Sequence, residues 1–152
     1  MDAAEITRAF EAAFDGALVF HAFADYLRDY DLYVFTMGRE YFRYRFVHCV
    51  SAEVRTQLTG ELWSRSLDDA FTTEDLDNAP DDGFVWGVRW QEMHPGLKLV
   101  ANSARAEYWR VRIGIPFHEA VVESNTQVIT LVFADLVVDP VAGGHTPFTI
   151  RD

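Results

Sequence analysis

The chain has 152 residues, a length that fits one domain. Its 49% hydrophobic and 24% charged residues are those of a globular protein and exclude a disordered or collagen-like chain. Its 13 basic and 24 acidic residues give a formal net charge of −11, which argues against a nucleic-acid binder or a protein that docks on anionic lipid.

A cytoplasmic location is expected from two features of the sequence. Cys49 is the only cysteine, so no intrachain disulfide can form, and a reducing compartment is the default. The first residues carry neither a basic nor an apolar segment of the kind found in signal peptides, and no apolar run approaches the ~20 residues that cross a bilayer.

The first expected element is a helix that begins at Asp2, since Glu5 follows three residues later as in a capping box. Its inner face, at helical spacing, should consist of Ile6, Phe10, Ala13 and Phe14. Residues 17–30 are compatible with a helix or with a buried strand. Residues 31–37 predict a strand that ends in a turn at Gly38.

Residues 40–50 alternate strictly and predict a strand. The aromatic face with Phe42, Tyr44 and Phe46 should meet the core, while Arg43 and Arg45 point the other way.

The middle of the chain predicts a second helix over residues 61–71, an acidic loop over 72–83 and a strand over 84–90. A turn at 94–96 and a short return strand over 97–100 follow.

A third helix is predicted over residues 104–113, capped by Asn102 or Ser103 and ended by Gly114. Its apolar stripe should consist of Ala104, Tyr108 and Val111. Residues 117–124 and 127–138 predict a hairpin, whose second strand is apolar on both faces and ends at residues 139–140. The sum is a single α+β domain over residues 1–140 with a tail over 141–152. We expect a mixed or mostly antiparallel sheet with about three helices packed on it.

No pattern predicts a cofactor, a metal site or a catalytic centre. The chain has no phosphate-binding loop, and its histidines are scattered: His21, His48, His94, His118 and His145. Cys49 ends an apolar strand and is expected to be buried and inert.

Three groups of residues are candidates for binding. Glu119 and Glu123 share one strand face and could act as acid and base, or pair across strands with Arg43 and Arg45. The stripe of Arg39, Tyr41, Arg43 and Arg45 is either a recognition surface or a neutralised sheet face. His21, followed by Asp25, Arg28, Asp29 and Tyr30, predicts a buried polar network or a pocket.

Five strings, taken in order, resemble the small bacterial YxiG-like proteins over about residues 6–138. They are HAF with DYLRDY at 21–30, LWSRSLD at 62–68, GFVWGV at 83–88, GIPF at 114–117, and ESN with LVFADL at 123–136. The resemblance implies no established activity. The family's namesake looks like a neighbour of a cell-wall-associated toxin system, so an antitoxin or immunity role is a further expectation that the resemblance implies.

Two functions from different classes fit these features. One is a non-enzymatic module that presents an acidic surface, centred on residues 68–82, to a basic protein partner. The other is a small-molecule-binding protein or minor enzyme with a pocket near His21, Arg28, Glu119 and Glu123. The sequence does not give the oligomeric state.

Overall fold

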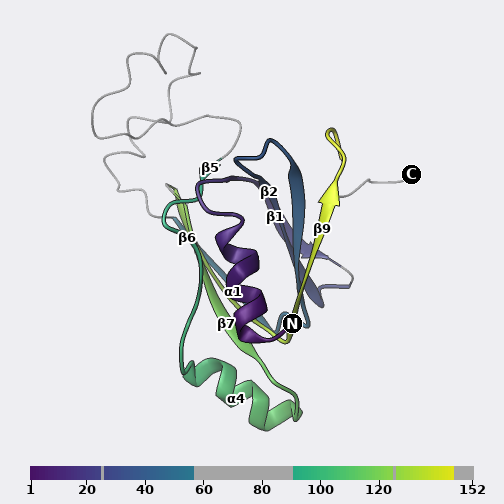
Figure 1. Ribbon diagram of the computed structural model, residues 1–152. Helices are drawn as coiled ribbons and strands as arrows, with labels where there is room; N and C mark the ends of the chain where they lie inside the picture. Colours follow the sequence, from purple (N-terminus) through teal and green to yellow (C-terminus); the bar gives the residue numbers. More distant parts are fainter. Residues whose placement is uncertain (25, 57–90, 125, 146–152) are drawn as a thin grey trace.

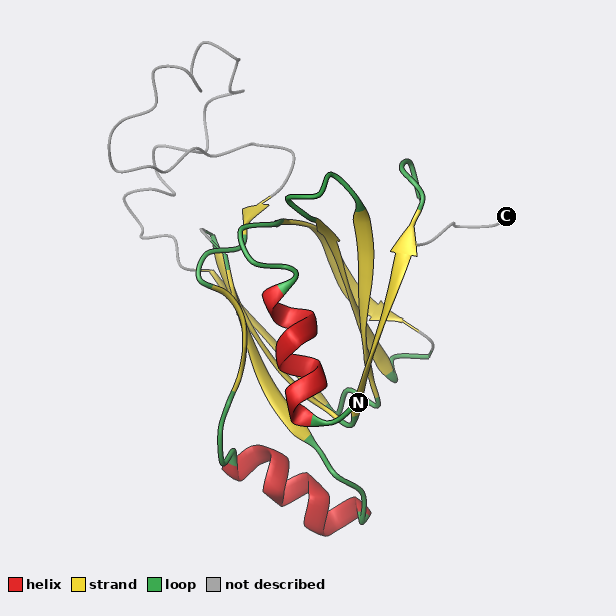
Figure 2. Cartoon of the chain, in the orientation of Figure 1, coloured by secondary structure: helices red, strands yellow, loops and turns green. Residues whose placement is uncertain are grey.

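The computed structural model describes residues 1–24, 26–56, 91–124 and 126–145, which form two antiparallel sheets and two helices (Figure 2). Sheet A has the strand order β5 (Gln91–Glu92), β1 (Ala17–Ala24), β2 (Asp29–Phe35), β3 (Tyr41–Val47) and β9 (Asp135–Val141). Sheet B has the order β4 (Ser51–Thr56), β8 (Gln127–Phe133), β7 (His118–Glu123) and β6 (Gly96–Leu99). The α+β class is therefore confirmed, but the expected single sheet is wrong, because the described strands form two sheets.

The segment that the sequence left open between helix and strand is a strand. Residues of β1 pair with β2 from Ala17 opposite Phe35 to Ala24 opposite Asp29. Tyr26 and Leu27 lie in the intervening turn at φ values of 61° and 64°, where a right-handed helix cannot continue. A helix through residues 17–30 would also have forfeited the pairing of β1 with both β2 and β5.

Two long segments pass from one sheet into the other and close one side of the sandwich. β3 continues into β4 through His48, and β8 continues into β9 through Ala134. The backbone N–H of Ala134 donates to Val47 O at 2.9 Å, so the two bends lie side by side. The predicted strand over 127–138 is thus two strands, and the second runs through Pro140 to Val141 instead of ending at 139–140.

Helix α1 (Ala3–Glu11) closes the opposite side, where it lies between the two sheets and packs on β6 (Figure 1). The predicted capping box is confirmed: Asp2 accepts from the backbone N–H of Glu5, and Glu5 accepts from that of Asp2, both at 2.8 Å. Ile6, Phe10 and Ala13 are buried as expected. Phe14, which follows the end of the helix at Glu11, is not buried as expected, and its side chain is 51% exposed.

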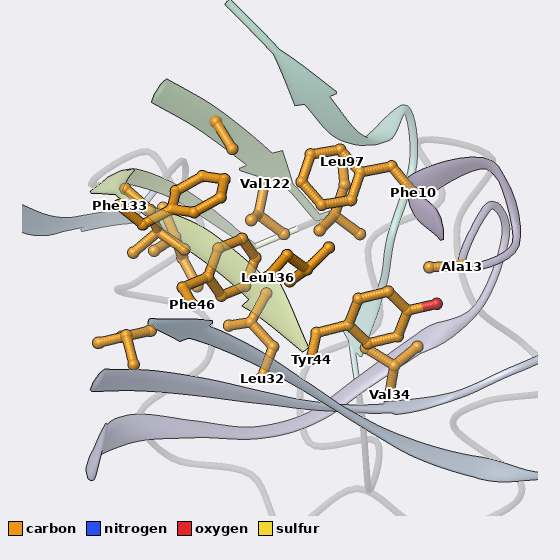
Figure 3. Packing of buried hydrophobic residues seen from close by; sticks show 14 of the residues in the cluster. Phe10, Ala13, Leu32, Val34, Tyr44, Phe46, Leu97, Val122, Phe133 and Leu136 are labelled. Carbon is orange, nitrogen blue, oxygen red and sulfur yellow. The ribbon is translucent and has the colours of Figure 1, made fainter. Parts of the chain in front are cut away.

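The core fills the space between the sheets and α1 (Figure 3). The expected inward face of β3 is confirmed, since Tyr44 and Phe46 are buried and Phe42 packs against the same cluster. Phe46 stacks edge-on against Phe133 of sheet B, with ring centroids 4.8 Å apart. Burying each such side chain contributes ~1.5–3 kcal/mol, so this contact ties the two sheets together.

Helix α4 (Ala104–Ile113) has the predicted bounds, with Ser103 as its N-cap and Gly114 at φ 85° after its last turn. Its predicted inner stripe is wrong. Ala106 is buried against Phe117 and Val132, whereas Tyr108 and Val111 are 52% and 68% exposed. Phe117 and Val132, which lie beneath the helix, determine which face of α4 meets the sheet. The spacing of residues within α4 does not contain this information.

Several predictions lie outside the described residues: the helix over 61–71, the acidic loop over 72–83, the strand over 84–90 and most of the tail over 141–152. Among the described helices, neither is long and apolar enough to cross a membrane.

Candidate functional site

A groove of about 570 Å³ runs along α1 where the helix faces β6. Its floor is apolar, and its polar groups stand on the rim. The lining residues are Thr7, Phe10, Glu11, Phe14, Pro95, Leu97, Lys98 and Leu99. The groove lies where α1 meets β6, which is an edge strand of sheet B among the described strands, so no further strand of the described residues covers the helix on that side.

Phe14 marks one end of the groove. Its ring lies 6.1 Å from that of His94, and His94 Nδ1 lies 3.3 Å from Asp15 Oδ1. Both His94 and Asp15 are largely solvated, so this pair contributes little stability. Phe14 is thus a half-exposed aromatic side chain next to an apolar groove, a combination that is common at interaction sites.

The N-terminal segment that contains α1 is acidic. Asp2, Glu5, Glu11 and Asp15 outnumber Arg8, which gives residues 2–15 a net side-chain charge of −3. Hydrogen bonding to the Glu5 backbone lowers the pKa of Asp2, so its carboxylate is ionised at neutral pH. Of the charged side chains that line the groove itself, Glu11 comes from α1 and Lys98 from β6, so the negative charge lies on the α1 side.

The arginines of β3 have other partners than those predicted. Arg45 binds Asp31 of β2 through two N–O contacts of 2.8 Å, and Arg43 binds Asp139 of β9 at 2.6 Å. The expected pairing with Glu119 and Glu123 is wrong, because both glutamates lie on β7 in the other sheet.

Arg39 does not continue the stripe of β3. It lies in the turn before the strand, at φ 61°, and its backbone N–H donates to Thr36 O at 2.9 Å. Whether Arg43 and Arg45 bind anything further stays a prediction.

His21 joins the two sheets at one end of the sandwich. Its Nδ1 lies 2.6 Å from the Tyr30 hydroxyl, and its Nε2 lies 3.0 Å from Gln127 Oε1. With Gln127 Oε1 as acceptor, Nε2 carries the proton and Tyr30 donates to Nδ1. Burial lowers the pKa of His21 and raises that of Tyr30 to about 12, so both groups are neutral near pH 7. The predicted network is present in part: among its described members Tyr30 binds His21 directly, whereas Asp25 lies outside the described residues.

Arg28 lies apart from this network. Its side chain is 63% exposed in the turn between β1 and β2, and its Nε is 3.9 Å from Asp29 Oδ1. Asp29 is buried and accepts from the backbone N–H of His48 at 2.9 Å, which fixes the bend between β3 and β4.

Glu119 anchors α4. Ser103 donates its hydroxyl hydrogen to Glu119 Oε2 and accepts from the backbone N–H of Ala106 at 3.0 Å. Arg105 Nη1 lies 3.6 Å from Glu119 Oε1. Sequence analysis found Ser103 as a cap but not its partner, since no local pattern links residues 103 and 119.

Glu123 shares the outer face of β7 with Glu119 but lies at the strand's other end, opposite Gly96 and Val128. His21 faces the interior, through Tyr30 and Gln127. The described positions of His21, Arg28, Glu119 and Glu123 therefore do not converge on one pocket.

Metal and thiol chemistry have little support among the described residues, in which no three His, Cys, Asp or Glu side chains cluster. Cys49 is buried, and burial raises its pKa to about 11, so the thiol is protonated at neutral pH. It donates to Ser51 O at 3.3 Å.

Comparison with known proteins places the chain by its sequence. No curated protein matches it significantly. The family model for YxiG-like proteins matches residues 2–151, which span both sheets, both helices and the groove. The match covers nearly the whole sequence, so the chain belongs to the YxiG-like protein family.

Proposed function

We propose that this protein is a non-enzymatic protein-binding module whose α1–β6 groove receives a basic, partly apolar segment of a partner. The observation that carries the proposal is Phe14, an aromatic side chain that is 51% exposed at the end of an apolar groove. Aromatic residues of this kind are common anchors of protein interfaces, because they bury much area at low entropic cost.

The negative charge of this protein favours a partner with a basic surface. The chain has a net charge of −11, and the N-terminal segment 2–15, which contains α1, has a net side-chain charge of −3. A basic partner is attracted over about one Debye length, ~8 Å at physiological salt, and this accelerates association. Glu11 on the rim of the groove then faces the partner's cations at the contact itself.

Proteins that neutralise a basic enzyme work in this way, by covering its cationic cleft with an acidic surface. An antitoxin or immunity role is one form of the proposed function. The expected acidic surface over residues 68–82 lies outside the described residues, so the proposal rests on α1.

The test is a comparison of variants in affinity capture, not capture alone. Wild type, Phe14→Ala and Glu11→Lys are immobilised with two matched controls, Tyr108→Ala and Glu40→Lys. Tyr108 is an aromatic residue 52% exposed on α4, and Glu40 is an exposed acid in the turn between β2 and β3.

We expect a basic protein that binds wild type and both controls, is lost from both groove variants and dissociates at high salt. A partner retained by Phe14→Ala and Glu11→Lys would show that the groove is not the binding site. An acidic partner would contradict the charge argument.

A further inference from the structure

The outer face of sheet A is laid out in rows by the strand register. One row places Asp31 beside Arg45, and the next places Phe20, Tyr33, Arg43 and Asp139 side by side across four strands. A third row places Phe35, Tyr41 and Val141 together. Charged side chains thus occupy one part of this face, and aromatic and aliphatic side chains occupy the adjoining part.

A β-bulge in β1 adds a second wall to the apolar part. Leu18 pairs with Val34 and Phe20 with Tyr33, so β1 contains one extra residue, Val19, between two pairs that are consecutive in β2. Adjacent residues of a regular strand point to opposite faces, but here both Val19 and Phe20 line the same pocket. Bulges commonly re-aim side chains beside binding sites.

The pocket has a volume of about 300 Å³ and is lined chiefly by Val19, Phe20, Tyr33, Tyr41, Val141 and His145. Tyr33 forms its floor and is only 8% exposed. The His145 ring stacks on Tyr33, with centroids 5.4 Å apart and an interplanar angle of 24°. His145 is held in place by a turn in which its backbone N–H donates to Ala142 O at 3.1 Å.

Charge on this face cancels within the sheet. Arg45 is paired with Asp31, and Arg43 with Asp139, so two cations face two anions. Burial raises the pKa of Tyr33, which keeps its hydroxyl protonated at neutral pH. A charged ligand would lose its hydration in this pocket without gaining a net opposite charge.

We propose that this pocket, which we call the sheet A pocket, binds a small, uncharged aromatic molecule. Its volume is at the lower end of small-molecule sites, ~300–1,000 Å³, which suits one or two rings. The ring of the ligand lies against Phe20, Tyr33 and Tyr41, and the tyrosine hydroxyls and the His145 ring supply its polar contacts. This site is separate from the α1–β6 groove, so its test does not depend on the proposed function.

The experiment titrates the full-length ¹⁵N-labelled chain with benzamide, benzoate and benzamidinium, which share one ring and differ in charge. We expect saturable shifts of the amide signals of Tyr33, Tyr41 and His145 with benzamide, and binding about tenfold weaker for either charged probe. Val19→Trp should fill the pocket and weaken benzamide binding by about tenfold or more. The matched control is Val54→Trp, an exposed valine 47% accessible on β4 of sheet B.

Several results would overturn the proposal. Shifts that stay linear in benzamide concentration would mean that no site exists, and equal binding by Val19→Trp would place the site elsewhere. Tighter binding of benzoate would make this an anion site of Arg43 and Arg45. Tighter binding after Phe148→Ala, at a position outside the described residues, would make the chain's own side chain the occupant.

Discussion

Arg45 and Asp31 face each other across β3 and β2 and are joined by two parallel N–O contacts of 2.8 Å. The Asp31 side chain is 5% exposed and that of Arg45 21% exposed. Two arginines that are equivalent in the alternation of β3 therefore differ in their surroundings, because the Asp139 side chain that binds Arg43 is 43% exposed.

This difference predicts unequal effects of two identical substitutions. Arg45→Gln leaves the Asp31 carboxylate buried without its cation and should lower the free energy of unfolding by roughly 3 kcal/mol. Arg43→Gln breaks a more solvated pair and should cost only ~0–1 kcal/mol. Urea denaturation of each single variant measures both. Equal losses would mean that Asp31 and Asp139 are equally well solvated in solution.

Among the core substitutions, we expect truncation of Phe46 to cause the largest loss of stability. It is fully buried between Phe10 and Phe133, with ring centroids 6.2 and 4.8 Å away. Phe46→Ala should cost ~3–5 kcal/mol, because it removes contacts to α1 and to sheet B together. Phe14→Ala removes the same side chain from a half-exposed position and should cost less than ~1 kcal/mol. Thermal unfolding measures the melting temperature of each variant. Equal melting temperatures for Phe46→Ala and Phe14→Ala would contradict the assignment of Phe46 to the core.

The third prediction concerns the contribution of the Ser103 N-cap to the stability of α4. Ser103→Ala removes both the helix N-cap and the hydrogen bond to Glu119 and should cost about 1–2 kcal/mol. Thr7→Ala is the control, since Thr7 donates to Ala3 O within α1 and caps nothing; its effect should stay within ~0.5 kcal/mol. Urea denaturation measures both, and an equal effect would show that the cap contributes nothing.

The elements that sequence analysis located correctly are those specified by neighbouring residues. The capping box of Asp2 and Glu5, the cap at Ser103 and the left-handed Gly114 all act within one helical turn, and the alternation of β3 is local as well. The alternation also predicted the inward side of β3, since burying large aromatic side chains such as Tyr44 and Phe46 stabilises the fold by ~1.5–3 kcal/mol each.

The remaining features depend on contacts between distant residues. The bend at Ala134 is set by the N–H donated to Val47, 87 positions earlier, so residues 127–138 look like one strand in isolation. Glu119 and Arg43 have opposite charges and suitable spacing, but the bends place them in different sheets. The same reasoning explains α4, whose buried Ala106 is selected by Phe117 and Val132. The pocket behind the Val19 bulge could not be predicted, because a bulge is defined only by its register with β2.

His21 predicts a pH dependence of stability. Burial lowers the pKa of His21 in the folded protein below its ordinary value of about 6.5, so the unfolded chain binds a proton more readily than the folded one. Its contribution is fully present above pH ~6.5 and is lost as the pH falls toward the folded pKa. His118 shifts in the same direction, also through burial. The unfolding free energy should therefore fall between pH 7.5 and 5.5, and His21→Gln should reduce that fall without abolishing it. Urea denaturation at the two pH values, above the range in which carboxylates titrate, measures the difference. An unchanged fall in His21→Gln would show that His21 does not titrate differently in the folded and unfolded states.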